Sequence, residues 1–281
     1  NDLPALSVSS PTGGEGGFAV FTVALSNPST TAVTFNPALA SGTATVGTDT
    51  ASALEYFNGT AWAAVPVGGV TIAAGSTSVQ VRVATTDDFA AEGNETFTLT
   101  ATVTAGSTSN ASAVGTATIT DDSDTTTVSL SATPSVVEGS SITYTATLTN
   151  AAVTPLTVTL SSGQTITIAA GATTGSVSIA APGEDPYFDV GSVSRSIAGA
   201  TGGGFESLTV NGAAVTTTVT DTIDTTTVSI TGDAVVAEGA TAAYTVSLTS
   251  PAQTAVTVNL SYSGIAADGS DLTGVATVTI P

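Results

Sequence analysis

The chain has 281 residues, enough for about two or three domains, and it contains neither cysteine nor histidine. Disulfide frameworks, thiolate or imidazole metal sites and catalytic triads that use His or Cys are therefore excluded. The 22 acidic residues against 2 basic ones give a net charge of −20, which leaves almost nothing to neutralise phosphates and excludes nucleic acid as a partner.

Targeting and membrane signals are missing from the sequence. It has no apolar stretch of about 18 residues and no signal peptide, so we expect no membrane insertion of this fragment. Methionine is absent as well, which predicts that the chain was excised from a longer protein.

Alternating strand signals dominate from the first turn onward. Residues 18–25, 77–83 and 96–103 alternate apolar residues such as Val, Phe and Leu with small or polar residues, as half-buried strands do. Gly, Asn, Asp and Pro interrupt such runs about every ten residues, a spacing typical of β-sandwiches. No segment has an apolar stripe of helical period. The sequence therefore predicts an all-β fold of tandem immunoglobulin-like antiparallel β-sandwiches arranged end to end.

An acidic hinge occurs twice and divides the chain. Asp121-Asp122-Ser123-Asp124 precedes the run Thr-Thr-Thr-Val-Ser, and Asp221-Thr222-Ile223-Asp224 precedes the same run 100 residues later. A repeat of this length is a domain rather than a solenoid unit. We therefore predict domains at residues 1–124, 125–224 and 225–281, with the hinges as joints between them.

The three segments share a plan. Each carries a Glu-Gly pair after its first strand, at residues 15–16, 138–139 and 238–239. The first two segments then carry an acidic turn, at residues 87–92 and 184–189, and close with a strand that ends in the hinge. The third segment stops at Pro281, before the counterparts of the later strands. We expect it to be completed by residues outside this chain or by another chain, or to be poorly ordered.

Strand direction predicts that these acids converge. The first strand carries the chain to the far pole of the sandwich before Glu15, and the last of seven strands ends at the same pole with Asp121. The turn at residues 87–92 reaches that pole too. Two carboxylates about 4 Å apart repel by about 4 kcal/mol at an effective dielectric of 20, so an ionised cluster needs a cation.

Calcium, with its 6–8 oxygen ligands in flexible geometry, suits loop-borne carboxylates best, and magnesium is the second choice. The alternative interpretation is that the acids are solvated turn residues that keep the chain soluble. Glu95 and Glu206 are among the acids left unassigned. The predicted calcium ligands are Glu15, Asp49, Asp87, Asp88, Glu92, Asp121, Asp122, Asp124, Glu138, Glu184, Asp185, Asp189, Asp221, Asp224, Glu238 and Asp271.

The first segment resembles a Calx-β domain, a calcium-binding module common in large bacterial surface proteins. The matching pieces are Glu15-Gly16, the run 42–49, Ala74-Gly75, the stretch 87–97 and the run 117–122. The resemblance implies calcium ligands at Glu15, Asp49, Asp87, Asp88, Glu92, Asp121 and Asp122.

The second segment is similar to the immunoglobulin-like extender repeats of very long repeats-in-toxin (RTX) adhesins. It has no acid between Glu138 and Glu184, so a counterpart of Asp49 is missing, and we expect fewer ions or weaker binding. The second hinge also lacks a second adjacent Asp, so we expect the first joint to be the stiffer one. The third segment returns toward the Calx-β form at residues 264–271. The glycine-aspartate nonapeptides of RTX tails are absent.

These features predict a non-catalytic extender of a bacterial cell-surface adhesin. Calcium would stiffen it, and it would project a distal binding region for attachment or biofilm formation. Its expected partners are calcium ions, neighbouring repeats and a host or surface glycan or protein. An intracellular calcium sensor and an enzyme are the weaker alternatives.

A further alternative is a calcium-dependent ligand-binding module that uses the hairpin predicted at residues 56–62, which holds the only tryptophan, Trp62. The plainer interpretation is that Trp62 and Phe57 cap the core. Arg82 and Arg195 are expected to pair with nearby acids.

Overall fold

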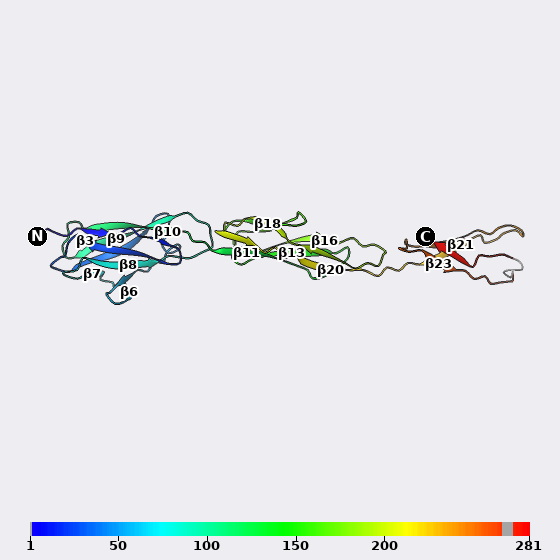
Figure 1. Cartoon of the computed structure of the whole chain (residues 1–281), viewed down its shortest axis with the longest axis horizontal. Coiled ribbons are helices and arrows are strands. Elements are labelled where there is room, and N and C mark those ends of the chain that lie inside the picture. The colour runs from blue at the N-terminus through cyan, green and yellow to red at the C-terminus, as the bar shows by residue number, and fades with distance from the viewer. Residues whose placement is uncertain (1, 266–271) are drawn as a thin grey trace.

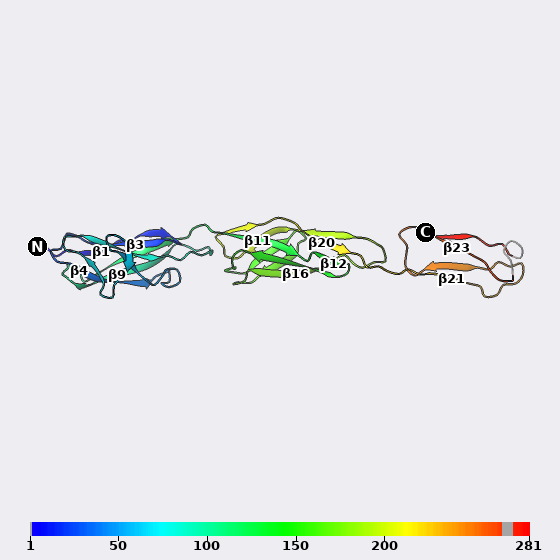
Figure 2. The ribbon, with the colours of Figure 1, turned by 90° about the horizontal axis from the view of Figure 1, so that it is seen from below.

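The computed structural model describes residues 2–265 and 272–281, and these residues form β-strands, turns and loops without a helix. The sheets follow one another along the long axis of an elongated molecule (Figures 1 and 2). The predicted all-β class is confirmed. Within these residues, no helix has the length and hydropathy that crossing a bilayer requires.

The first segment contains two five-stranded sheets. One sheet has the order β1 (Leu6–Val8), β3 (Phe18–Leu25), β8 (Ser78–Ala84), β5 (Glu55–Phe57) and β6 (Trp62–Ala64). The other has the order β2 (Thr12–Gly14), β10 (Ser112–Thr120), β9 (Glu95–Ala105), β4 (Val33–Ser41) and β7 (Val70–Ile72). The pairing of β2 with β10 is parallel, whereas the other neighbours are antiparallel.

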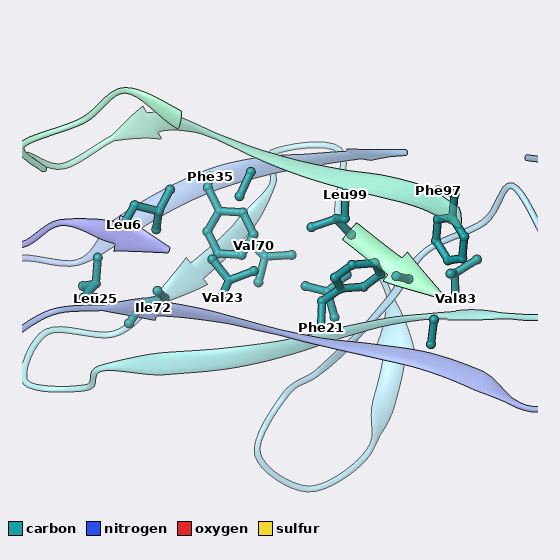
Figure 3. Packing of buried hydrophobic residues seen from close by; sticks show 14 of the residues in the cluster. Leu6, Phe21, Val23, Leu25, Phe35, Val70, Ile72, Val83, Phe97 and Leu99 are labelled. Atoms are coloured by element: carbon teal, nitrogen blue, oxygen red, sulfur yellow. The ribbon is translucent and has the colours of Figure 1, made fainter. Parts of the chain in front are cut away.

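The core of the first segment lies between these sheets (Figure 3). Alternate residues of β3 point inward, and its Phe21 is fully buried. Phe21 meets Phe97 of β9 edge to face, with ring centroids 5.9 Å apart. Full burial of such a ring contributes about 1.5–3 kcal/mol. The strand predicted at residues 18–25 is confirmed as β3 with the same bounds.

The second segment has its own core and three smaller sheets. The first sheet has the order β16 (Thr174–Ala180), β13 (Ser141–Leu148), β11 (Thr125–Ala132) and β19 (Ser207–Val210). The second has the order β12 (Ser135–Val137), β20 (Val215–Thr220) and β17 (Gly191–Arg195). The third has the order β15 (Thr165–Ile168), β14 (Leu156–Leu160) and β18 (Ile197–Gly202). Its hydrophobic cluster shares no residue with that of the first segment. The parallel pairing of β12 with β20 repeats that of β2 with β10.

The third segment has two separate two-stranded sheets. β21 (Val228–Gly232) pairs with β22 (Tyr244–Leu248), and β23 (Val256–Asn259) pairs with β24 (Thr277–Ile280). None of its described residues belongs to either buried core cluster, and Val228, Ile230 and Tyr244 are exposed. Within the described residues, its sheets thus leave these apolar side chains uncovered.

Candidate metal centre at the segment joints

The acids of the first segment converge because of the parallel pairing between β2 and β10. After β2, the backbone N–H of Glu15 donates to the carbonyl of Thr120 (3.2 Å), the last residue of β10. The N–H of Gly16 donates to the carbonyl of Thr86 (3.3 Å), just before the acidic turn. Glu15, the turn at residues 87–92 and Asp121 are therefore held at one pole.

The second segment builds the same scaffold. The N–H of Glu138 donates to the carbonyl of Thr220 (3.0 Å), and the N–H of Gly139 donates to the carbonyl of Pro182 (2.7 Å). Glu138 therefore corresponds to Glu15. The parallel strand pairing and these hydrogen bonds bring the Glu-Gly pair, the acidic turn and the hinge together in both segments.

The glycine of the Glu-Gly pair has a conformational role. Gly16 has φ +64° and Gly139 has φ +69°, a backbone region that side chains disfavour. A Cβ added to Gly16 would lie 3.2 Å from the Cβ, Cγ and Oδ1 atoms of Asp87, which is tighter than ordinary packing. Glycine thus turns the chain sharply and lets the acidic turn approach the loop.

Two groups of carboxylates form at the first joint. Glu15, Asp88 and Glu206 have ligand atoms within 4.8 Å of one another, and so do Asp87, Asp122 and Asp124. Five of these six are predicted ligands. Glu206 is not, and it comes from the second segment.

The loop that carries Glu206 docks on the acidic turn of the first segment. Ala90 and Phe205 form an antiparallel β-bridge, and the N–H of Ala91 donates to the carbonyl of Gly204 (2.9 Å). Asp124 donates its N–H to the Glu206 carboxylate. The sequence offered one signal for this residue, because Glu206 is the only acid between Asp189 and Asp221.

Hydrogen bonds fix part of the acidic turn. The N–H of Ala90 donates to Oδ1 of Asp88 (2.7 Å), and the N–H of Glu92 donates to Oδ2 of Asp121 (3.4 Å). Asp49 is engaged within its own loop, where its Oδ2 accepts a hydrogen bond from the N–H of Thr45 (2.6 Å).

Burial and then repulsion between like charges raise several pKa values at the first joint. Burial, with added repulsion from Asp88 and Asp121, raises the pKa of Glu15 to about 7. Burial and repulsion from Asp88 and Asp49 raise the pKa of Glu92. Glu95 is not among the predicted ligands, but burial and then repulsion from Asp49 raise its pKa, so it lies at the edge of this cluster.

At the hinge, burial and then repulsion from Asp122 and Asp87 raise the pKa of Asp124. For Glu206, the hydrogen bond from Asp124 lowers the pKa. Burial and repulsion from Asp121, Asp122 and Asp124 together outweigh that bond, so its pKa is raised. Asp124 and Glu206, which join the two segments, thus lie among other carboxylates whose negative charge is not compensated.

The donor set fits a hard cation. Oδ1 of Asp121 and Oε1 of Glu206 are buried and have no hydrogen-bond partner, so each has lone pairs left for a ligand. All the donors are carboxylate oxygens, which calcium prefers. Among the described residues, the one ion pair is between Arg82 and Glu55, so Arg82 is already engaged.

The second joint holds a smaller group. Glu138, Asp189 and Asp221 have ligand atoms within 4.8 Å of one another. The N–H of Asp189 donates to Oδ1 of Asp221 (3.3 Å), as Glu92 does to Asp121. Asp185 accepts from the N–H of Tyr187 (2.8 Å), as Asp88 does from Ala90.

Thr222 stands in the second hinge where Asp122 stands in the first. Its N–H and hydroxyl donate to Oε1 of Glu138 (3.0 and 3.2 Å), and its hydroxyl also contacts Glu184. Glu138 is buried, and its Oε1 accepts both of these bonds. At this hinge position the second joint therefore lacks the carboxylate that Asp122 provides at the first.

Several predicted ligands belong to none of the groups found among the described residues, namely Asp49, Glu92, Asp121, Glu184, Asp185, Asp224 and Glu238. Asp224 and Glu238 are also exposed. Asp271 lies outside the described residues, as does most of the run at 264–271.

The predicted hairpin forms, but Phe57 and Trp62 do not cap the core. Phe57 of β5 pairs with Trp62 of β6, with ring centroids 5.5 Å apart, and both lie outside the core cluster. Tyr56 packs against the core instead. The Arg82 guanidinium lies 3.8 Å from the Phe18 ring centroid and 4.3 Å from that of Trp62, while its Nε donates to Glu55 (2.7 Å). The Phe18 and Trp62 rings therefore both contact the Arg82 guanidinium at the surface.

Arg82 pairs with an acid as predicted, but the prediction for Arg195 is wrong. Arg195 forms no ion pair among the described residues; its Nη1 donates to the carbonyl of Ser194 (3.4 Å), and its Nε is buried without a partner.

Comparisons with known proteins give one family match. A family model described as the LapA domain matches residues 124–222 and 224–278, together more than half of the chain. No curated protein was found to match. The crystal structure of the class 5 fimbriae chaperone CfaA is similar over 67% of this chain and 87% of that chain, with 11% sequence identity and a TM-score of 0.24.

Proposed function

Because this chain belongs to the LapA domain family, a family of large bacterial adhesins, we propose that it is an extender segment whose joints are stiffened by calcium. The family is adhesive and structural rather than enzymatic, and it belongs to the cell surface. The proposal adds a role for this segment: to project a distal binding region away from the cell for attachment or biofilm formation.

The observation that carries the proposal is the position of Glu206. This carboxylate comes from the second segment and lies with Glu15 and Asp88 of the first. A cation held by these three groups would be bonded to both segments at once. Residues at the hinge between them would then lose freedom, because the segments could no longer rotate independently.

The charge of the site supports calcium as the ligand. Six grouped carboxylates without a nearby cationic side chain are unfavourable, since each close pair costs about 4 kcal/mol at an effective dielectric of 20. Glu15, Asp87, Asp88, Asp121, Asp122, Asp124 and Glu206 would hold the ion or ions. At a free calcium concentration about 100 times Kd, binding would add about 2.7 kcal/mol per site to folding stability.

We further propose that the first segment, which lies largely outside the matched residues, is a Calx-β-like domain. In support, Asp87, Asp88 and Asp121 lie at one pole with Glu15, as the resemblance requires. The second segment would be the weaker calcium site, because Thr222 replaces a carboxylate there.

Calcium titration by isothermal calorimetry on the whole chain tests the proposal. We expect saturable binding with more than one affinity, and weaker binding of magnesium under the same conditions. Absence of a calcium signal at millimolar concentrations would contradict the proposal.

A second candidate function is recognition of a neutral glycan or a peptide by the hairpin. A groove beside it is lined by Tyr56, Phe57 and Asn58, and by uncharged polar residues such as Thr71 and Gln80. An aromatic wall with neutral hydrogen-bonding groups suits sugars. A glycan array with the unchanged chain and with Phe57→Ala and Trp62→Ala tests this, and calcium binding should be equal in all three proteins.

A further inference from the structure

An arginine of the second segment occupies a position that is buried and apolar in the first. Arg195 of β17 pairs with Val215 of β20, and Leu99 of β9 pairs with Gly115 of β10. Gly115 and Val215 hold the same place before the two hinges, so Arg195 is the counterpart of Leu99. Leu99 has no exposed surface. A cation thus stands where the first segment buries a leucine.

The guanidinium of Arg195 is only partly satisfied by the protein. The residue is half-buried, and its Nε is buried without a hydrogen-bond partner. Its Nη1 donates to the carbonyl of the adjacent Ser194, at 3.4 Å, and it forms no ion pair among the described residues. Because a buried charged donor without an acceptor is unfavourable, this group favours an anion.

The turn after β14 adds a hydroxyl beside the same strand. The N–H of Ser161 donates to the carbonyl of Ser196 (2.9 Å), and the N–H of Ser196 donates to Oγ of Ser161 (3.2 Å). These bonds hold the turn next to the residue that follows Arg195. The next residue of the turn, Ser162, has a buried Oγ without a hydrogen-bond partner. Two unengaged polar groups therefore lie on neighbouring elements.

The backbone of β17 has an open edge. The strand is last in its sheet, after β12 and β20, and no described strand pairs with its other side. Thr218 of β20 lies opposite Ser192 and donates its N–H in the other direction, to Pro134 (3.0 Å). In an antiparallel ladder, the N–H and carbonyl of Ser192 then also point away from their neighbour. Ser192 therefore presents both groups to the open edge.

The corresponding edge is covered in the first segment. Thr96, the counterpart of Ser192, accepts a hydrogen bond from the N–H of Ala44 (2.9 Å) and donates its own N–H to Oγ1 of Thr43 (2.7 Å). β4 continues this cover along β9, starting with Ser41 opposite Phe97. In the second segment, β14 pairs with β18 and β15 but not with β17. The open edge therefore comes from the shorter β14.

We propose that β17 binds an extended peptide segment of another protein, which adds to the sheet as a further strand and brings an Asp or Glu side chain to Arg195. The backbone of the peptide bonds to Ser192, and its carboxylate accepts from Nε of Arg195 and from the hydroxyl of Ser162. Backbone pairing supplies affinity in this mode of recognition, and the charge-assisted bond supplies specificity.

The acids of this chain argue against a second copy as the occupant. Among the described residues, only Glu55 and Glu95 lie in strands, and both strands have a neighbour on each side. Glu55 is also paired with Arg82. Two copies, each with a net charge of −20, repel each other as well. The occupant is therefore a segment of low charge, with a carboxylate in an extended stretch.

Titration with a synthetic peptide, followed by NMR of the whole chain, tests the proposal. The probe is acetyl-Thr-Val-Thr-Glu-Thr-Val-Thr-amide, which has Val, Glu and Val on one face of a strand. Its matched control has Gln in place of Glu. EDTA and about 0.15 M salt are present, so the result does not depend on the proposed calcium role and long-range repulsion is screened.

We expect the Glu peptide to shift the amide signals of β17 and the Nε–H signal of Arg195, and to bind about tenfold more tightly than the Gln peptide. Arg195→Leu, which installs the residue type of the first segment, should remove that difference. Equal affinities of the unchanged chain for the two peptides, or shifts confined to other strands, would overturn the proposal. Absence of saturable shifts at millimolar peptide would also overturn it and leave Arg195 as an inward charge that blocks edge pairing.

Discussion

The Glu206 carboxylate of the second segment accepts a hydrogen bond from the backbone N–H of Asp124, the last residue of the first hinge. The other oxygen of Glu206 is buried without a hydrogen-bond partner, and the Glu206 carboxylate belongs to the group that contains Glu15 and Asp88. One carboxylate thus both bonds to the hinge and lies with the acidic pole of the neighbouring segment. This arrangement couples the positions of the two segments at the hinge.

Removal of the Glu206 charge should weaken calcium binding at the first joint. We expect Glu206→Gln to raise the Kd about tenfold to a hundredfold, equivalent to about 1.4–2.8 kcal/mol, because the cation loses a ligand from the second segment. Calorimetric titration measures the change. The matched control is Asp2→Asn, which removes the same charge from an exposed residue outside the cluster. Equal Kd values for the two variants would contradict the assignment.

The raised pKa of Glu15 predicts how the metal-free protein responds to pH. The folded-state pKa of about 7 lies above the ordinary value of 4.5, so the protonated carboxyl stabilises the fold. That contribution is fully present below about pH 4.5 and is lost as the pH rises through about 7. Thermal unfolding in EDTA should therefore show the melting temperature falling across this window.

Two comparisons separate the contribution of Glu15 to this pH dependence from the contributions of the other acids in the cluster. Glu15→Gln should flatten the pH dependence in EDTA, because the titrating group is gone. Saturating calcium should remove the fall in the unchanged protein, since the cation stabilises the ionised form. A fall of the same size in Glu15→Gln would show that other groups cause it.

The threonine of the second hinge can be converted to the residue of the first. Thr222→Asp adds a carboxylate beside Glu138 and removes the hydroxyl that contacts Glu138 and Glu184. We expect lower stability in EDTA and calcium affinity at the second joint about tenfold higher. Thr222→Asn, which has the same shape as Asp without its charge, should show the loss of stability without the gain in affinity.

The close approach of Gly16 to Asp87 gives a backbone test. Gly16→Ala should destabilise the first segment by about 1–2 kcal/mol, because of its positive φ and its 3.2 Å contact with Asp87. Gly47→Ala is the matched control, since Gly47 has φ +96° and nothing within 4 Å of the added Cβ. Urea unfolding should show the smaller loss for Gly47→Ala. Only Gly16→Ala should also weaken calcium binding.

Trp62 reports on the surface cluster around Arg82. Arg82→Ala removes the cation between the Phe18 and Trp62 rings and the ion pair with Glu55. We expect a change in Trp62 fluorescence and a loss of about 1–2 kcal/mol in stability. Arg195→Ala is the control and should leave the fluorescence unchanged, because Arg195 contacts neither ring among the interactions of the described residues.

Local patterns predicted the strands well. The alternation at residues 18–25 reflects one buried face, and the structure forms β3 over the same residues. The hairpin at residues 56–62 also forms. Both depend on short-range chemistry that a sequence displays directly. The domain boundaries at 124 and 224 stay predictions.

The candidate site could be predicted only in part. Glu15, Asp88 and Asp121 were found because a repeated plan marks them and strand direction places them at one pole. Glu206 was missed because its position depends on the bridge between Ala90 and Phe205, a contact between segments that no periodicity signals. The capping role expected of Trp62 failed because its ring stacks with Arg82 at the surface.

The most direct test of the central claim measures the distance between the segments with and without calcium. The chain has no cysteine, so Ser78→Cys and Thr174→Cys, both at exposed strand positions, allow one spin label in each segment. Double electron–electron resonance should give a broad distance distribution in EDTA and a narrow one in calcium. Adding Glu206→Gln should keep the distribution broad in calcium. A distribution of the same width with and without calcium would contradict the account.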